Sequence, residues 1–143
     1  MTKLFHTLLF VFCGLSLSAQ TVLDFQRTLR VDYQFTGDAG SREIALSELC
    51  SFEGWAGRRV NMDRVPLKGN GDMTLRDART GRVLYCQSFS TLFQEWVTTD
   101  EARHVRRAFE NCFLLPMPTD SARITVRLFG MDQQGEAEYT HTV

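Results

Sequence analysis

Apolar and polar residues alternate along most of this chain, and a period of two residues predicts β-strands. The clearest run is residues 28–35, in which every second side chain is apolar. Similar alternation occupies 43–49, 122–128 and 136–143. A weaker apolar run at 60–67 is also expected to be extended. The pattern therefore predicts a protein built mainly from short, half-buried strands.

Residues 73–87 predict a β-hairpin. The segment between Asp77 and Arg82 is rich in turn residues, and Gly81 in it can adopt a positive φ angle. If Asp77 pairs with Arg82 across a four-residue loop, four apolar side chains fall on one face of the hairpin. They form two cross-strand pairs: Leu75 with Leu84, and Met73 with Cys86.

Helical signals are confined to two short segments. Ser90 or Thr91 can cap a single helical turn. Thr98 followed by Glu101 fits a capping box, which predicts a short helix before an extended run that ends at Pro116. Several short strands with so little helix predict a mainly β fold, a single antiparallel β-sandwich with one or two short helical turns. The pattern leaves immunoglobulin-like and jelly-roll strand orders open.

The N-terminal segment predicts export. A lysine precedes an apolar run over residues 8–17, and small residues lead up to Ala19. These features are typical of a secretory signal peptide, here residues 1–19, followed by one domain over residues 20–143. The apolar run is shorter than the roughly 20 residues of a membrane-spanning helix. We therefore expect no membrane span and an exported protein: periplasmic, cell-surface or secreted.

Charge argues against a nucleic-acid partner. The sequence has 16 Lys and Arg residues against 17 Asp and Glu residues, a formal net charge of −1, and no block of like charge. Domains that bind nucleic acid generally present a basic patch. We therefore expect neither a nucleic-acid partner nor a polybasic membrane contact.

Candidate chemistry is sparse. Three of the four cysteines fall in the predicted domain, namely Cys50, Cys86 and Cys112. An odd number leaves at least one free, and buried free thiols are favoured over a bridge. His104 and His141 match no zinc-ligand spacing, and no motif places a nucleophile beside a base. We assign no catalytic residue, metal ligand or cofactor.

The glycine-broken loop after the second predicted strand is the expected interaction surface. It contains Trp55, Arg58 and Arg59. Aromatic and arginine side chains dominate the binding energy of many protein interfaces. In the alternative interpretation, Trp55 fills the edge of the sandwich and the two arginines are a solvated pair.

Five phrases of the sequence, taken in order, resemble a known family. They are Leu29–Tyr33, Gly54–Arg59, Gly69–Gly71, Ser88–Trp96, and Phe109–Asn111 leading to Leu115-Pro116. Together they resemble the N-terminal domain of bacterial secreted zinc metallopeptidases of the IgA-peptidase type (peptidase family M64). The resemblance implies a β-sandwich accessory domain that precedes a zinc catalytic domain with a His-Glu-x-x-His helix.

No catalytic or metal-ligating residue carries over from this family, because the 143 residues contain no His-Glu-x-x-His motif. The resemblance therefore predicts a non-catalytic accessory or docking domain, here without the catalytic domain. Its expected partner is a protein, either a metallopeptidase catalytic domain or another surface partner. The alternatives are a free-standing extracytoplasmic sandwich that binds carbohydrate or protein, and a vestigial fragment.

Overall fold

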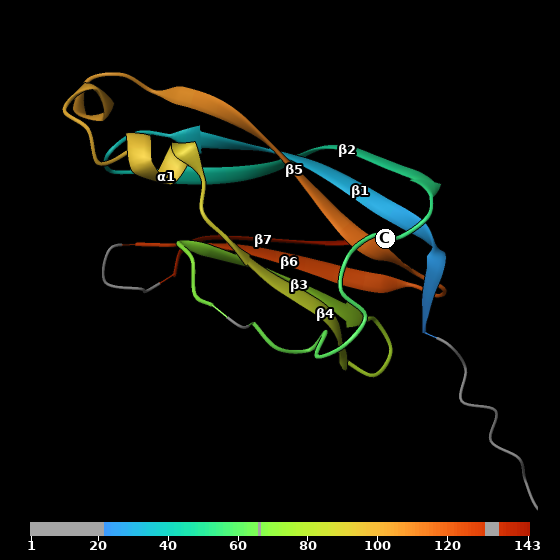
Figure 1. Ribbon diagram of the computed structural model, residues 1–143. Coiled ribbons are helices and arrows are strands. Elements are labelled where there is room, and N and C mark those ends of the chain that lie inside the picture. Colours follow the sequence, from blue (N-terminus) through green and yellow to red (C-terminus); the bar gives the residue numbers. More distant parts are fainter. Residues whose placement is uncertain (1–21, 66, 131–134) are drawn as a thin grey trace, which may run out of the picture.

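The computed structural model describes residues 22–65, 67–130 and 135–143, which form two antiparallel β-sheets packed face to face (Figure 1). The predicted signal peptide, residues 1–19, lies outside the described residues. The mainly β sandwich that the alternation predicts is confirmed.

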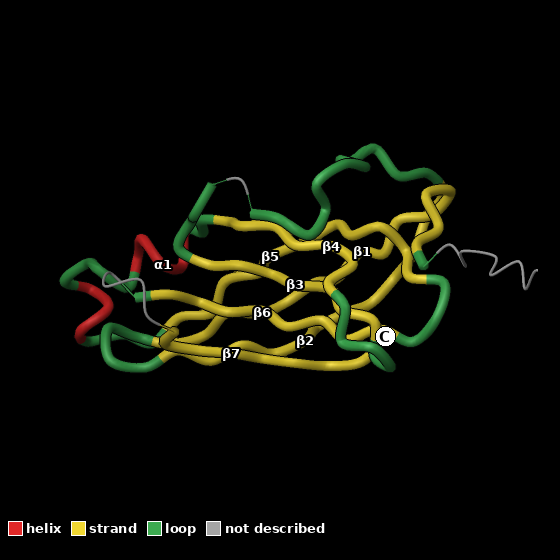
Figure 2. The backbone as a smooth tube through the Cα atoms, turned by 90° about the horizontal axis from the view of Figure 1, so that it is seen from below, coloured by secondary structure: helices red, strands yellow, loops and turns green. Residues whose placement is uncertain are grey.

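Seven strands build the two sheets. The smaller sheet has the order β2-β1-β5, with β1 at Leu23–Gly37, β2 at Arg42–Glu53 and β5 at Arg107–Pro118. The larger sheet has the order β4-β3-β6-β7, with β3 at Gly71–Asp77, β4 at Val83–Phe89, β6 at Ala122–Phe129 and β7 at Gly135–Thr142. Figure 2 views the larger sheet from its outer side. The first strand is central in its sheet, whereas immunoglobulin constant-type domains place it at an edge.

The core lies between the sheets and begins with the predicted alternation of β1. Its inward side chains, Leu29, Val31, Tyr33 and Phe35, are all buried. The larger sheet faces them with buried apolar residues from its two central strands: Met73, Leu75, Ile124, Val126 and Leu128. Two short helical elements connect β4 to β5 and close one end, α1 at Leu92–Trp96 and the 3₁₀ turn η1 at Glu101–Arg103.

The β3-β4 hairpin has the predicted turn but a different register. The Asp77 N–H donates to the Arg82 carbonyl at 2.9 Å, as the four-residue loop requires. A β-bulge at Leu84 then shifts the pairing by one residue, so Leu75 pairs with Tyr85 and Thr74 with Cys86. The predicted pairs Leu75–Leu84 and Met73–Cys86 are therefore wrong. An extra residue on one strand reverses which side chains share a face.

Burial in this hairpin still separates its core residues from Thr74. We expect Leu75→Ala and Leu84→Ala each to lower the unfolding free energy by about 2–5 kcal/mol, because both side chains are buried. Thr74 is only half-buried and lies on the opposite face from Leu75, so Thr74→Ala should cost about 1 kcal/mol or less. Urea unfolding of the three variants measures this. An equal loss of unfolding free energy for Thr74→Ala would contradict the assignment of the Leu75 face as the buried face of the hairpin.

A second β-bulge lies in β2 and explains an irregular sequence pattern. Tyr33 pairs with Leu46 and Val31 pairs with Leu49, so Ser47 is the extra residue. The bulge keeps Ile44, Leu46 and Leu49 on the inner face although their spacing is uneven. Beyond it, every residue of β2 is exposed, including Leu49 at 39%. The second half of β2 therefore projects past the cover of the larger sheet.

The capping box predicted at Thr98 does not form, for a local reason. The hydroxyls of Thr98 and Thr99 donate back to the carbonyls of Glu95 and Trp96, each at 2.7 Å. They therefore complete the end of α1, and the short helix predicted after Thr98 is the 3₁₀ turn η1, which no side chain caps. Among the described residues of 60–67, no strand forms.

Tyr33 and His141 make a polar contact between the sheets, with 2.6 Å between the Tyr33 hydroxyl and His141 Nε2. Burial lowers the pKa of His141, so the folded protein binds this proton less readily than the unfolded chain. The stability that this contributes is complete above the unfolded histidine's pKa of about 6.5. It is lost as the pH falls from that value toward the lower folded pKa.

In His141→Gln, the unfolding free energy should therefore decrease less than in the wild type as the pH falls from about 7.5 to about 5.5. Glutamine stays neutral over this range, so the part of the pH dependence that comes from His141 disappears. Urea unfolding at the two pH values measures the change. The exposed His104, replaced by Gln, is the control, and an unchanged slope in His141→Gln would contradict the prediction.

Candidate functional site

The outer face of the β2-β1-β5 sheet is the candidate functional site. Directly paired residues of antiparallel strands share a face, so the register defines its membership. Its rows of three, each from β2, β1 and β5, are Phe52-Thr28-Pro116, Cys50-Arg30-Leu114 and Glu48-Asp32-Cys112. Two apolar side chains stand out: Phe52 is 47% exposed and Leu114 is 44% exposed.

The outer face of the larger sheet has a different character. Its central rows are made of threonines and charged residues: Asp72, Thr74, Arg76, Arg123, Thr125, Arg127, Glu138 and Thr140. Several of these side chains bond to one another: Thr125 with Thr140 at 2.9 Å, and Arg127 with Asp72 at 2.8 Å. A solvated sheet face normally looks like this, so the apolar content of the smaller sheet's outer face is unusual within this molecule.

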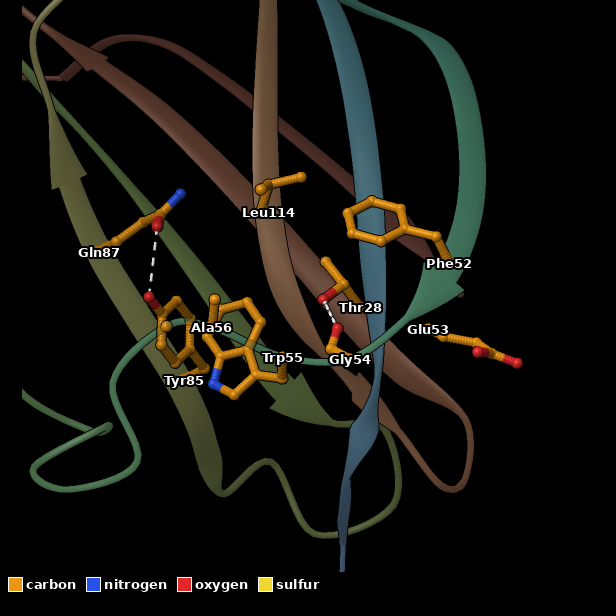
Figure 3. Close-up of a pocket in the computed structure, with 10 residues that line it drawn as sticks. Thr28, Phe52, Glu53, Gly54, Trp55, Ala56, Tyr85, Gln87 and Leu114 are labelled. Carbon is orange, nitrogen blue, oxygen red and sulfur yellow. Dashed lines mark hydrogen bonds between the residues drawn. The ribbon is translucent and has the colours of Figure 1, made fainter.

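A groove of about 650 Å³ crosses one end of the candidate face. Phe52 and Leu114 point toward each other across β1, with Thr28 between them (Figure 3). The segment from Glu53 to Gly57 forms the adjoining wall, and Tyr85 and Gln87 of β4 complete the lining. The groove is therefore mainly apolar, as protein-binding and ligand-binding depressions commonly are.

Trp55 anchors the wall of this groove. It is 7% exposed, its Nε1 donates to the Arg58 carbonyl at 3.1 Å, and its ring meets Tyr85 edge-on at 5.7 Å. A Cβ atom on Gly57 would lie 2.2 Å from the indole, so glycine is needed for this approach. The side chain of Trp55 is therefore buried, as in the alternative interpretation, and the residue nevertheless lines the groove.

The two arginines hold the same loop in place. The Arg58 guanidinium donates to the carbonyls of Arg64 at 2.8 Å and Cys86, and it lies 5.1 Å from the centre of the Tyr85 ring. The Cys86 N–H donates to the Met62 carbonyl at 2.7 Å. The loop thus covers the free edge of β4, which blocks unwanted strand pairing there.

The predicted surface residues lie together in this loop beside the groove, but with unequal exposure. Arg58 is half-buried, and the exposed Arg59 lies over the Phe25 ring at 5.2 Å. Their role in binding stays a prediction. Phe52 and Leu114 were not predicted from the sequence as surface residues. The signal was present for Leu114, because three apolar residues in a row at 113–115 leave one of them on the polar face of a strand.

Charge on the candidate face is unevenly neutralised. Arg30 pairs with Asp32 at 2.8 Å and holds the pKa of that carboxyl below its usual range. A second hollow of about 380 Å³ lies around this pair, with Glu48, Glu110 and Cys112 in its lining. Desolvation raises the pKa of the Cys112 thiol, and Asp32 raises it further. The thiol is therefore protonated near neutral pH and is a poor nucleophile.

The described cysteines are all free: Cys86 is buried, as predicted for a small apolar residue, whereas Cys50 and Cys112 are exposed. Within the described parts of the chain, no group of three or more His, Cys, Asp or Glu side chains is placed to hold a metal ion. No helix in those same ranges is both long and apolar enough to cross a membrane.

The fold and the face together define a β-sandwich domain with an exposed apolar surface on its smaller sheet. The family model described as Peptidase M64 N-terminus matches residues 22–140. This chain therefore belongs to that family, the N-terminal domain of M64 peptidases, and the resemblance found in the sequence is confirmed. The search among curated proteins gave no match.

Proposed function

We propose that this chain is a non-catalytic accessory domain of a secreted zinc metallopeptidase system and that it works by docking against the peptidase catalytic domain. The family match supports the link to M64 peptidases. The observation that carries docking is the exposed apolar pair Phe52 and Leu114 on an otherwise well-formed sheet face. Contiguous exposed apolar patches on soluble proteins often mark interaction sites.

Export is part of the same proposal. Residues 1–19 carry the charge, apolar run and small residues of a signal peptide, so we propose cleavage between Ala19 and Gln20. A periplasmic, cell-surface or secreted location would bring the domain into contact with an exported peptidase.

The test is a two-component experiment with an M64 catalytic domain from the same genome. The purified protein alone should leave peptide substrates intact, because its 143 residues contain no His-Glu-x-x-His motif. Mixed with the catalytic domain, it should elute from gel filtration as a one-to-one complex. Peptide cleavage by the protein alone, or separate elution at micromolar concentrations, would contradict the proposal.

A sugar-binding role has weaker support. Carbohydrate-binding platforms present the flat face of an aromatic ring, whereas Trp55 and Tyr85 are both buried and pack edge-on against each other. The docking function fits this groove better because Phe52 and Leu114 are the large apolar side chains that it exposes.

A further inference from the structure

We propose that the outer face of the β2-β1-β5 sheet binds a segment of its protein partner in which apolar side chains are flanked by Lys or Arg. This inference rests on the proposed docking function and adds the surface and the chemistry of the partner. It is carried by the placement of apolar, thiol and unpaired carboxylate side chains on one sheet face.

One end of the face carries exposed apolar side chains. Phe52 and Leu114 flank the strand β1, and the exposed thiols of Cys50 and Cys112 extend the weakly polar area along β2 and β5. Leu49, on the other side of β2, is exposed as well. The end of β2 thus carries apolar side chains on both faces, and a partner that covers it removes them from water.

The margin of the face is acidic. Glu48 and Glu110 both belong to this face and line the hollow around Arg30. Among the described residues, no ion pair engages either of these two carboxylates. Arg30 is the arginine that the described register places among them, and Asp32 already pairs with it. The surface potential is therefore negative and favours a partner with Lys or Arg around its apolar contact.

The same charges disfavour a second copy of this chain as the occupant. A two-fold symmetric contact places the same patch on both subunits. The acidic margin of one copy would then face the acidic margin of the other, and Arg30 on this face is already paired with Asp32. An apolar patch bordered by charged residues instead matches the anatomy of an interface between different proteins.

The experiment compares variants of the face in their binding to the M64 catalytic domain. Leu114→Ser removes apolar contact, and Glu48→Lys and Glu110→Lys reverse the charge of the margin. Each should weaken binding about tenfold or more. The matched controls are Leu92→Ser on α1 and Glu138→Lys on β7, both exposed and away from this face. The controls should change affinity by about twofold or less, and thermal unfolding verifies that all five variants fold.

A peptide probe separates this inference from the proposed function. The peptide Lys-Arg-Leu-Val-Phe-Leu-Arg-Lys should bind the wild-type protein and should bind Glu48→Lys more weakly. It should also bind the wild-type protein more tightly than the same peptide with Glu in place of each Lys and Arg. If all face variants bind the catalytic domain equally well, the outer face is not the binding surface, but the docking function is not contradicted. Peptide binding without catalytic-domain binding would support the face and overturn the proposed partner. Binding of neither would overturn both.

Discussion

Replacing Phe35 with alanine should lower the unfolding free energy by about 3–5 kcal/mol. The side chain is fully buried at the centre of the aromatic cluster between the sheets. Its ring centre lies about 6 Å from the rings of three residues on other elements, namely Phe89 at 6.1 Å, Phe93 at 6.2 Å and Phe113 at 6.3 Å. Alanine removes the ring from all of these contacts at once, and the surrounding strands cannot close the cavity fully.

Urea unfolding measures this loss, and Gln34→Ala is the control. Gln34 is the neighbour of Phe35 on the same strand but points outward and is exposed, so its replacement should change stability by less than about 1 kcal/mol. A cost for Phe35→Ala below that of Gln34→Ala would show that the two sheets do not pack around this cluster.

Replacing Trp55 with alanine should cost a similar amount, about 3–5 kcal/mol, and should also release the loop that follows it. The indole is buried against Tyr85 and bonds to the Arg58 carbonyl. Without it, the contacts that bind this loop to the edge of β4 lose their anchor. The buried thiol of Cys86, whose backbone those contacts hold, should then react faster with an alkylating reagent.

Alkylation followed by mass spectrometry distinguishes this local effect from general destabilisation. Phe35→Ala serves as the comparison, because its cavity lies in the core and leaves the loop attached. At equal global stability, adjusted with urea, Trp55→Ala should label Cys86 faster than Phe35→Ala does. Equal labelling rates would mean that Trp55 contributes packing but does not hold the loop.

The fold could be predicted wherever alternation runs unbroken. The even alternation of residues 28–35 and 122–128 located β1 and β6. The bulges at Ser47 and Leu84 could not be predicted, because one extra residue in a strand leaves no compositional signal and yet reverses the faces that follow. The loop after Trp55 was also missed, because its segment at 60–67 is apolar enough to resemble a strand. The described part of the loop instead bonds to the edge of β4 through the Met62 carbonyl and the Arg58 side chain.

The candidate site could be predicted only in part. Trp55 and Arg58 were predicted as surface residues from their residue types, and both lie beside the groove. Residue type alone does not show that the Arg58 guanidinium donates hydrogen bonds to backbone carbonyls within the fold. Exposure of Phe52 and Leu114 depends on the register of three strands that are distant in sequence, so it emerged only with the folded sheet.

Hydrogen–deuterium exchange of the protein, free and bound to an M64 catalytic domain, tests the docking claim most directly. Docking on the outer face of the smaller sheet predicts slower exchange at amides of residues 48–52 and 110–114 in the complex, because the partner covers both strands. Amides of β6 and β7 should keep their free rates. Protection confined to the larger sheet, or no protection anywhere under conditions that saturate the complex, would contradict it.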